Sequence, residues 1–205
     1  MIPDYWPQAK RSLARRDAVL GGIIRAHPGI ALQRRGEPFF TLARSIVGQQ
    51  ISVKAAQSVW DRLAVAAPRM RPRDVLELDM PVLRACGLSQ RKAEYVRDLA
   101  GKFQDGTLHG ALWGEMGDEA IIAELVQVRG IGRWTAEMFL IFNLLRPDVL
   151  PVDDLGLQRA IRLHYFGGRA VKLQRIRKLA VAWTPWRSVA TWYLWRSLDP
   201  VPVEY

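Results

Sequence analysis

The chain has 205 residues, a formal net charge of +10 and one cysteine, Cys86. This length supports one core or two small lobes without disulfides, and a single thiol excludes a four-cysteine zinc site or a cysteine-held iron–sulfur cluster within the chain. The first residues form no apolar signal segment, and no run approaches the roughly 20 apolar residues that cross a bilayer. We therefore expect a soluble protein of a reducing compartment that is not secreted.

The excess of basic residues predicts a polyanionic partner. The chain holds 30 Lys and Arg against 20 Asp and Glu, and residues 159–178 carry seven of these basic side chains and no acid. Arginine, the commoner of the two, matches phosphate groups and stacks on bases. A basic run is also typical of a solvated helix face, so this alternative stays open for each single arginine.

Apolar residues recur at helical spacing along most of the chain, and no stretch alternates as a strand does. The expected helices cover residues 17–26, 39–66 with an internal break left open, 73–78, 81–86, 89–104, 118–128, 133–145, 153–165, 170–182 and 186–197. Glycines and prolines punctuate the ends of these segments, and no repeat or low-complexity linker separates them. The sequence predicts an all-α fold without an independent second domain.

A glycine turn lies between two of the expected helices. The helix before it is expected to begin with Asp118 as its N-cap and to bury a face made of Ile121, Ile122, Leu125 and Val126. Gly130 and Gly132 leave free backbone N–H groups at the start of the next helix and let a phosphate approach, while Ile131 is expected to fold into the core. An ordinary helix–helix turn with a C-cap glycine is the alternative.

Two adjacent carboxylates follow the apolar helix that begins after this turn. That helix is expected to run through the middle of the protein and to stop at Pro147. Asp153 is the expected N-cap of the next helix, which leaves Asp154 without that role. Amides and the helix dipole favour an ionised carboxylate at this position. A surface acid that merely complements the dipole is the alternative for Asp154.

Three motifs together resemble a known family. They are GIGRWTA and PVDD within residues 125–159, IVGQQISVKAA at residues 46–56, and WTPWRSVA at residues 183–190 with Trp195 beyond. The pattern resembles the helix-hairpin-helix DNA glycosylase superfamily, and within it the 3-methyladenine DNA glycosylase II family. The resemblance runs from about Phe39 to Trp195 and indicates a short form without an N-terminal β domain.

The resemblance implies a fold and an activity. The fold is a single glycosylase domain, a compact two-lobed helical bundle with a helix-hairpin-helix motif, with lobe A at residues 38–147, lobe B at residues 1–37 plus 148–205, and the active-site cleft between them. The activity is that of a monofunctional N-glycosyl hydrolase of base excision repair, which flips out and excises alkylated purines (3-methyladenine and 7-methylguanine, with hypoxanthine as a further substrate). The partner is damaged double-stranded DNA, with no membrane involved. The protein is expected to be monomeric and cytoplasmic (nucleoid-associated in a bacterium, nuclear in a eukaryote).

Two alternatives stay open for the function. The first is a non-catalytic relative that binds damaged DNA, and the second is a glycosylase for a different damaged base, such as an oxidised guanine. The acid at Asp154 argues against the first, because a carboxylate near phosphates weakens DNA binding. The absence of a lysine at Trp134 argues against excision of oxidised guanine.

The family pattern assigns the catalytic role to Asp154, as the anion that stabilises positive charge on the sugar. It places Trp134, Met138 and Trp195 in the base pocket, where electron-rich rings favour a cationic base. Trp134 stands where bifunctional relatives carry a lysine, so no amine is available to cut the strand. Core packing is the alternative for Trp134, and it is the interpretation we adopt for Trp183, Trp186 and Trp192.

The same pattern implies the DNA contacts. Gln50 would fill the gap left by the flipped nucleotide, Ile51 would wedge the opposite strand, and Ser52 would lie near the minor groove; an ordinary helix N-terminus is the alternative for this turn. The hairpin residues implied in DNA binding are Gly130, Ile131, Gly132, Arg133 and Thr135. No cofactor is expected, although the resemblance implies a structural Na+ or K+ on the carbonyls of Val126, Val128 and Ile131.

Overall fold

The structure, a computed structural model, describes residues 2–198. The helices are α1 (Trp6–Arg16), α2 (Ala18–Ala26), α3 (Pro38–Gly48), α4 (Val53–Ala66), α5 (Pro72–Leu76), α6 (Met80–Ala85), α7 (Gln90–Gln104), α8 (Asp118–Leu125), α9 (Arg133–Phe142), α10 (Leu155–Phe166), α11 (Leu173–Ala180), the short 3-10 helix η1 (Val181–Trp183) and α12 (Arg187–Leu198). No strand occurs in the described residues, so the predicted all-α class is confirmed. None of the helices within residues 2–198 combines the length and the apolar character that spanning a membrane requires.

The chain divides into two compact units. Unit 2 is a continuous stretch, residues 35–139, with α3 to α8 and most of α9. Unit 1 combines the described residues 2–34 and 140–198, with α1, α2, the end of α9 and α10 to α12. The division falls inside α9, between Phe139 and Leu140.

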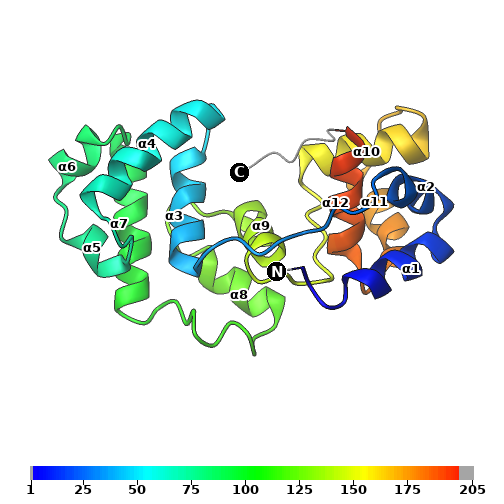
Figure 1. Cartoon of the computed structure of the whole chain (residues 1–205), viewed down its shortest axis with the longest axis horizontal. Helices are drawn as coiled ribbons and strands as arrows, with labels where there is room; N and C mark the ends of the chain where they lie inside the picture. Colours follow the sequence, from blue (N-terminus) through cyan, green and yellow to red (C-terminus); the bar gives the residue numbers. More distant parts are fainter. Residues whose placement is uncertain (1, 199–205) are drawn as a thin grey trace. The chain divides into compact units, whose positions relative to one another are not determined.

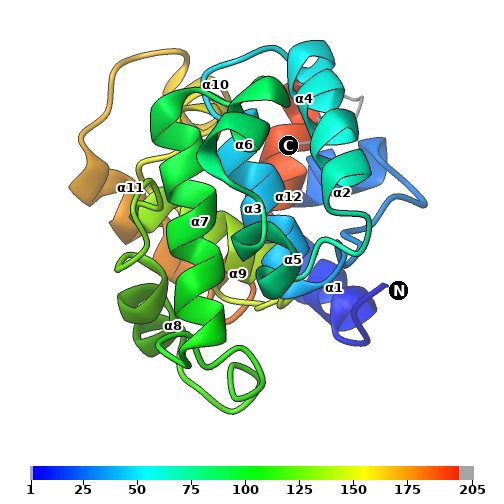
Figure 2. The same ribbon diagram turned by 90° about the vertical axis from the view of Figure 1, so that its left-hand side faces the viewer.

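Unit 2 is built around α7, which packs against α3, α5 and α6 (Figure 2). Apolar residues at helical spacing make this possible, because Val96 and Leu99 of α7 are completely buried together with Leu63 of α4. A chain of edge-to-face aromatic contacts leads through Phe39, Phe103, Trp113 and Phe139, with ring centroids 5.2–5.7 Å apart. These rings attach α9 to the core of unit 2.

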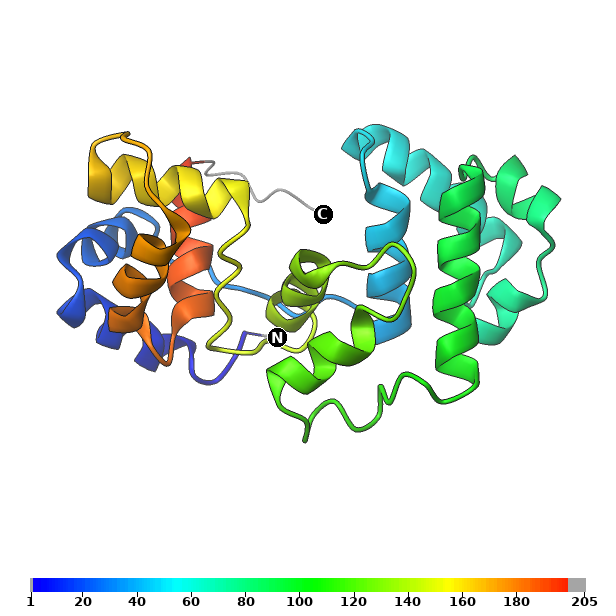
Figure 3. The ribbon, with the colours of Figure 1, turned by 180° about the vertical axis from the view of Figure 1, so that it is seen from behind.

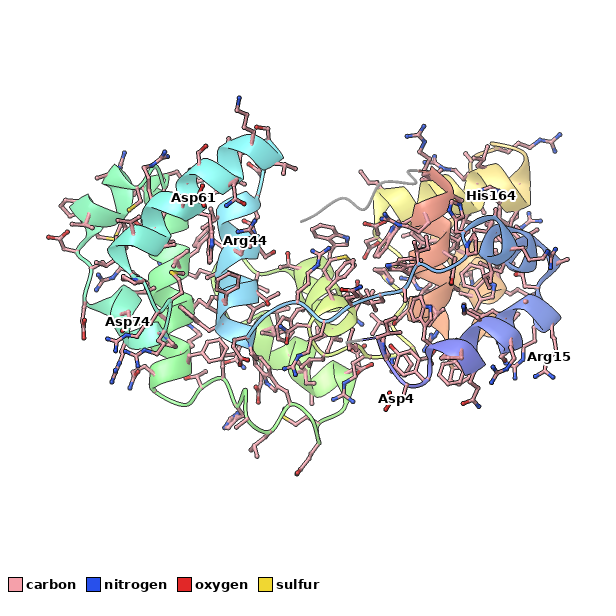
Figure 4. All side chains as sticks on the ribbon, viewed as in Figure 1. Asp4, Arg15, Arg44, Asp61, Asp74 and His164 are labelled. Carbon is pink, nitrogen blue, oxygen red and sulfur yellow. The ribbon has the colours of Figure 1, made fainter. Side chains whose placement is uncertain are left out.

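Helices α3 and α4 of unit 2 are also fixed to each other. Arg44 projects from α3 beside α4 (Figure 4), donates to Gln57 Oε1 at 2.6 Å and faces the Trp60 ring at 5.5 Å. Phe40 contacts the same ring edge-on. The two helices that flank the Gln49–Ser52 turn therefore form one packed pair.

Unit 1 joins the N-terminal helices α1 and α2 to the later helices α10 to α12 (Figure 1). Trp6 of α1 is buried against Trp192 and Tyr193 of α12, with centroids 5.3 and 5.8 Å away. Asp17, the N-cap of α2, accepts hydrogen bonds from the Leu20 amide, the Tyr165 hydroxyl and the Trp183 indole. The N-terminal helices therefore complete the core that the C-terminal helices begin.

Several predicted helix boundaries are wrong. Helix α1 was not predicted. The break that was left open within residues 39–66 does occur, between α3 and α4, where Gln50 has a left-handed backbone with φ +58. Gly117 rather than Asp118 is the N-cap of α8, because the extended backbone before the first turn lies at the glycine. Val126 follows the last turn of α8 and is 43% exposed, so it does not belong to the buried face.

Helix α9 also ends earlier than expected. Its last residue is Phe142, and Leu145 adopts a left-handed backbone with φ +55 before the chain reaches Pro147. A left-handed residue cannot continue an α-helix. The chain after α9 therefore turns before the proline.

Candidate active site

Asp154 is the N-cap of α10 and is buried, at 9% exposure. Its Oδ1 accepts the Leu157 amide at 2.6 Å, and its backbone is extended. The prediction that Asp153 caps this helix is wrong, because the Asp154 amide bonds to the Pro151 carbonyl and closes a turn that delays the helix to Leu155. Asp153 lies exposed outside the helix. The fold thus fixes the Asp154 carboxylate at the positive end of the α10 dipole.

A tryptophan from α12 reaches the same carboxylate. The Trp195 indole N–H donates to Asp154 Oδ1 at 2.8 Å, and Phe142 stacks on the indole with centroids 5.7 Å apart and an interplanar angle of 12°. The Leu157 amide and the Trp195 indole therefore donate to the same oxygen of Asp154. The structure thus brings together two predicted site residues, Asp154 at the start of α10 and Trp195 in α12.

Gly156 is a part of this arrangement that the motifs did not reveal. A Cβ at this position would lie 3.1 Å from Asp154 Oδ1 and 3.3 Å from Trp195 Cδ1. Both contacts are tighter than ordinary van der Waals separation. The absence of a side chain therefore leaves room for the indole to approach the carboxylate.

The other two predicted pocket residues lie on the part of α9 assigned to unit 2. Trp134 is 39% exposed and Met138 is half-buried one helical turn later. The exposure of Trp134 does not fit the core-packing alternative. By contrast Trp183 and Trp192 are buried and Trp186 stacks on Tyr5, in agreement with the packing role expected for these three.

The hairpin between α8 and α9 (Figure 3) uses its two glycines differently. Gly130 has φ +85, and a Cβ there would lie 2.2 Å from the Tyr95 ring, so both backbone and packing require glycine. A Cβ at Gly132 would meet nothing within 4 Å. Ile131 is buried, as predicted.

The two side chains at the start of α9 that were predicted to bind DNA are engaged within the protein. Arg133 pairs with Glu119 and Glu137, and the bond to Glu119 raises the pKa of the guanidinium. Thr135 is buried. The Arg133 guanidinium is thus already paired with two acids, although about half of its side chain (51%) is exposed.

The predicted gap-filling turn connects α3 to α4. Gln50 and Ile51 are exposed, and Ser52 caps α4 by accepting the Ala55 amide at 3.2 Å. The neighbouring Gln49 donates through Nε2 to the Gly130 carbonyl at 2.9 Å. Gln49 was not predicted as a site residue, yet it joins the turn to the hairpin.

The predicted cation ligands all lie at the hairpin. Val126 is the C-cap of α8, and the Val128 carbonyl accepts the Ile131 amide at 3.1 Å. Carbonyl oxygens at a helix end are suitable ligands for a monovalent cation. Across residues 2–198, no group of three or more His, Cys, Asp or Glu side chains is placed to hold a metal ion.

A groove of about 850 Å³ also lies in unit 2, at the start of α3. Its walls include Phe39, Phe40, Arg71, Phe103 and Leu112. Asp74, at the nearby start of α5 (Figure 4), binds the Arg71 guanidinium, and this bond lowers the pKa of the carboxyl to about 2. None of the predicted site residues lines this groove.

These features define a class of protein. Helices α8 and α9 and the glycine turn between them form a helix-hairpin-helix element in an all-helical chain that also carries a buried, helix-capping aspartate. The model of the HhH-GPD superfamily, described as base excision DNA repair proteins, matches residues 43–185. The chain belongs to this superfamily, and the resemblance predicted from the motifs is confirmed.

Named relatives agree. DNA-3-methyladenine glycosylase 1 of Schizosaccharomyces pombe is 33% identical over 175 residues, which cover 83% of this chain and 76% of the relative. A crystal structure of a DNA-3-methyladenine glycosidase from Bacillus halodurans is 32% identical, with a TM-score of 0.87 over 93% of this chain and 89% of that one. The structure of a 3-methyladenine DNA glycosylase from S. pombe in complex with abasic DNA is 28% identical, with a TM-score of 0.80 over 97% and 98%.

Proposed function

We propose that this protein is a DNA-3-methyladenine glycosylase that removes alkylated purines by hydrolysis of the N-glycosidic bond. The observation that carries the proposal is Asp154, a buried carboxylate fixed by the α10 amide of Leu157 and by the Trp195 indole. Membership of a DNA repair superfamily and the names of the relatives support it.

The chemistry follows from the charge of the reacting groups. Departure of a purine leaves positive charge on the sugar, and a fixed anion in a water-poor site stabilises that charge. Asp154 supplies the anion and also orients or deprotonates the attacking water. An alkylated purine such as 3-methyladenine or 7-methylguanine already carries positive charge and leaves as a neutral base, so it needs no strong general acid. Hypoxanthine carries no such charge and is proposed as a poorer substrate.

The reaction proposed is base release without strand cleavage. Strand cleavage through a Schiff base requires an amine, and an indole stands at Trp134 where bifunctional relatives carry a lysine. Trp134, Met138 and Trp195 are proposed to contact the cationic base through their electron-rich groups. The enzyme is proposed to act as a cytoplasmic or nuclear monomer, because flipping one base requires one active site.

The hairpin is proposed to bind a DNA phosphate through backbone amides around Gly130, Gly132 and Thr135. Helix N-termini with free N–H groups bind anions, and the open space at Gly132 allows a phosphate to approach. Arg133, whose side chain is half exposed, would add a charge beside this turn, and Ile131 would take part only through its backbone because its side chain is buried. A monovalent cation on the carbonyls of Val126, Val128 and Ile131 would add positive charge beside that phosphate.

The turn between α3 and α4 is proposed to enter the DNA. Gln50 would occupy the gap left by the extruded nucleotide, with Ile51 against the opposite strand and Ser52 toward the minor groove. The exposure of Gln50 and Ile51 supports this assignment, because both are available to a ligand.

The variant Asp154→Asn tests the catalytic assignment. It keeps the size of the side chain and an oxygen that caps α10, but it removes the charge. Single-turnover release of 3-methyladenine from methylated DNA should fall by about 10²–10³-fold, the usual effect of losing one electrostatic stabiliser of a transition state. Affinity for an abasic-site analogue should change little.

Asp153→Asn is the matched control, because Asp153 is exposed and does not cap the helix. It should retain the wild-type rate. Near-normal excision by Asp154→Asn would remove the catalytic role from Asp154, and tight DNA binding without any base release by the wild-type protein would favour a non-catalytic relative. Wild-type product strands should stay intact until they are heated in alkali.

A further inference from the structure

Lys92, near the start of α7, binds two backbone carbonyls at the C-terminal end of α3. Its Nζ donates to the Val47 carbonyl at 2.7 Å and to the Gln49 carbonyl at 2.6 Å. Both carbonyls lie at the C-terminal end of α3, where helix carbonyls lack intrahelical donors and the dipole favours a cation. Burial lowers the pKa of Lys92, so this lysine is partly withdrawn from water.

The bond from Lys92 to the Gln49 carbonyl comes immediately before an unusual residue. Gln50 has φ +58, in the left-handed region that residues with a Cβ rarely adopt. After it, Ser52 fixes the chain again as the N-cap of α4. The left-handed conformation of Gln50 is therefore held by its neighbours on both sides rather than by its own preference.

Gln49 is held at a second point. Its Nε2 donates to the Gly130 carbonyl in the hairpin at 2.9 Å, and the Gly130 backbone rests directly on the Tyr95 ring of α7. One turn further along α7, Asp98 accepts the Arg129 amide at 2.9 Å. One side of α7 thus contacts both the Gln50 turn, through Lys92, and the hairpin, through Tyr95 and Asp98.

We propose that Lys92 and Gln49 are positioning residues that hold Gln50 ready for insertion into DNA, at a fixed place relative to the phosphate-binding hairpin. Neither side chain needs to touch DNA for this role, because each acts through the backbone of the turn. The inference rests on the proposed function, in which Gln50 fills the gap and the hairpin holds a phosphate. It predicts that loss of either side chain affects insertion more than affinity.

The test measures insertion without catalysis. A duplex carries an abasic-site analogue with 2-aminopurine beside it, and insertion of a side chain into the gap unstacks the probe and raises its fluorescence. Lys92→Met removes both hydrogen bonds but keeps the apolar stem, and Gln49→Met removes the amide donor without adding charge. Each variant should lose at least about half of the fluorescence gain at saturation, because the left-handed backbone of Gln50 then loses a contact that holds it. The loss should be larger for Lys92→Met, since hydrogen bonds from a charged group are the stronger ones.

The dissociation constant for the duplex should stay within about threefold of wild type, because phosphate contacts dominate affinity. Gln50→Ala marks the signal without a gap-filling side chain, and Lys10→Met, on α1 of unit 1, is the matched lysine control with an expected wild-type signal. Gln49→Met leaves both Lys92 bonds in place, so it tests the idea even if Lys92→Met is poorly folded.

The outcomes separate this inference from the function. If both variants keep the full fluorescence gain, or lose signal only in proportion to weaker binding, the positioning role is wrong even where the wild-type enzyme releases 3-methyladenine. If the wild-type protein releases no base but the variants lose insertion as expected, the proposed activity fails and the positioning role stands.

Discussion

Trp195 makes two different contacts beside Asp154, one through its ring face and one through its N–H. The N–H is committed to Asp154 Oδ1, and the ring is stacked on Phe142. Since Oδ1 also accepts the Leu157 amide, the orientation of the carboxylate is fixed by two donors on one oxygen. The second oxygen, Oδ2, is thereby given a defined direction. Trp195 therefore holds the carboxylate through its N–H, in addition to the contact with the base that we propose for its ring.

The variant Trp195→Phe separates these two contributions. Phenylalanine retains an aromatic face but loses the N–H donor, so Asp154 loses one of its orienting bonds. A hydrogen bond to a charged group contributes about 1.5–3 kcal/mol, so kcat should fall about 10- to 100-fold, with a smaller change in KM. The measurement is multiple-turnover excision of 3-methyladenine over a range of substrate concentrations.

Trp186→Phe provides the control. It makes the same change of size elsewhere in unit 1, where Trp186 stacks on Tyr5. It should leave both parameters close to wild type. An unchanged kcat in Trp195→Phe would mean that the indole N–H is dispensable for Asp154.

The motifs singled out Asp154 and Trp195, but they did not predict the hydrogen bond between them or the cap that Asp154 forms. The predicted N-cap was wrong by one residue because the turn that begins at Pro151 extends to Asp154. Two adjacent aspartates are equally suitable caps, so the sequence alone does not distinguish them. The bond from Trp195 to Asp154 joins residues that are 41 apart in sequence, and the bond from Lys92 to Gln49 joins residues that are 43 apart. Such contacts depend on tertiary packing, so local periodicity could not predict them.

Among the helices, long apolar periodic segments were predicted well and irregular ones poorly. Helix α1 was missed because Pro7 and a run of basic residues obscure a face made of Trp6, Ala9 and Leu13, although proline is tolerated in a first turn. Residues 49–52, which separate α3 from α4, include no glycine or proline, although α3 ends at Gly48. Lys92 and Ser52 fix that break through contacts instead of residue preference.

The α8–α9 hairpin gives a prediction at the level of the element, from two glycines in one turn. Gly130→Ala places a Cβ on the Tyr95 ring and strains a residue of positive φ. The free energy of unfolding should therefore fall by about 1–3 kcal/mol, and the midpoint of thermal unfolding should fall with it. Gly132→Ala meets open space and should leave that midpoint unchanged. If a phosphate approaches the turn, Gly132→Ala should still weaken binding to duplex DNA.

Calorimetry and DNA titration on the same two variants distinguish the roles. Equal thermal stability for both variants would contradict the packing argument at Gly130. Unchanged DNA affinity in Gly132→Ala would show that no ligand approaches the hairpin closely at that residue.

At the scale of the whole molecule, unit 1 depends on residues from both ends of the chain. Asp17 binds Tyr165 and Trp183, which lie 148 and 166 residues away, and burial together with Asp17 raises the pKa of the Tyr165 hydroxyl. Helix α12, which carries Trp195, packs against α1 and α2. The sequence-based assignment of segments to lobes could not supply these pairings, because they are set by side-chain fit rather than by spacing.

Trp6 of α1 packs against α12, the helix that carries Trp195, the proposed pocket residue. It is 2% exposed and contacts both Trp192 and Tyr193. Trp6→Ala should reduce the free energy of unfolding by about 3–5 kcal/mol, as large-to-small changes of buried aromatic residues do. Because the lost contacts are with α12, the rate of base release should also become more sensitive to temperature.

Val181→Ala, at a residue 70% exposed in the same unit, should alter stability by less than about 0.5 kcal/mol. Urea unfolding of both variants, followed by tryptophan fluorescence, measures the difference; a Trp6→Ala protein as stable as wild type would show that α1 packs on unit 1 without stabilising it.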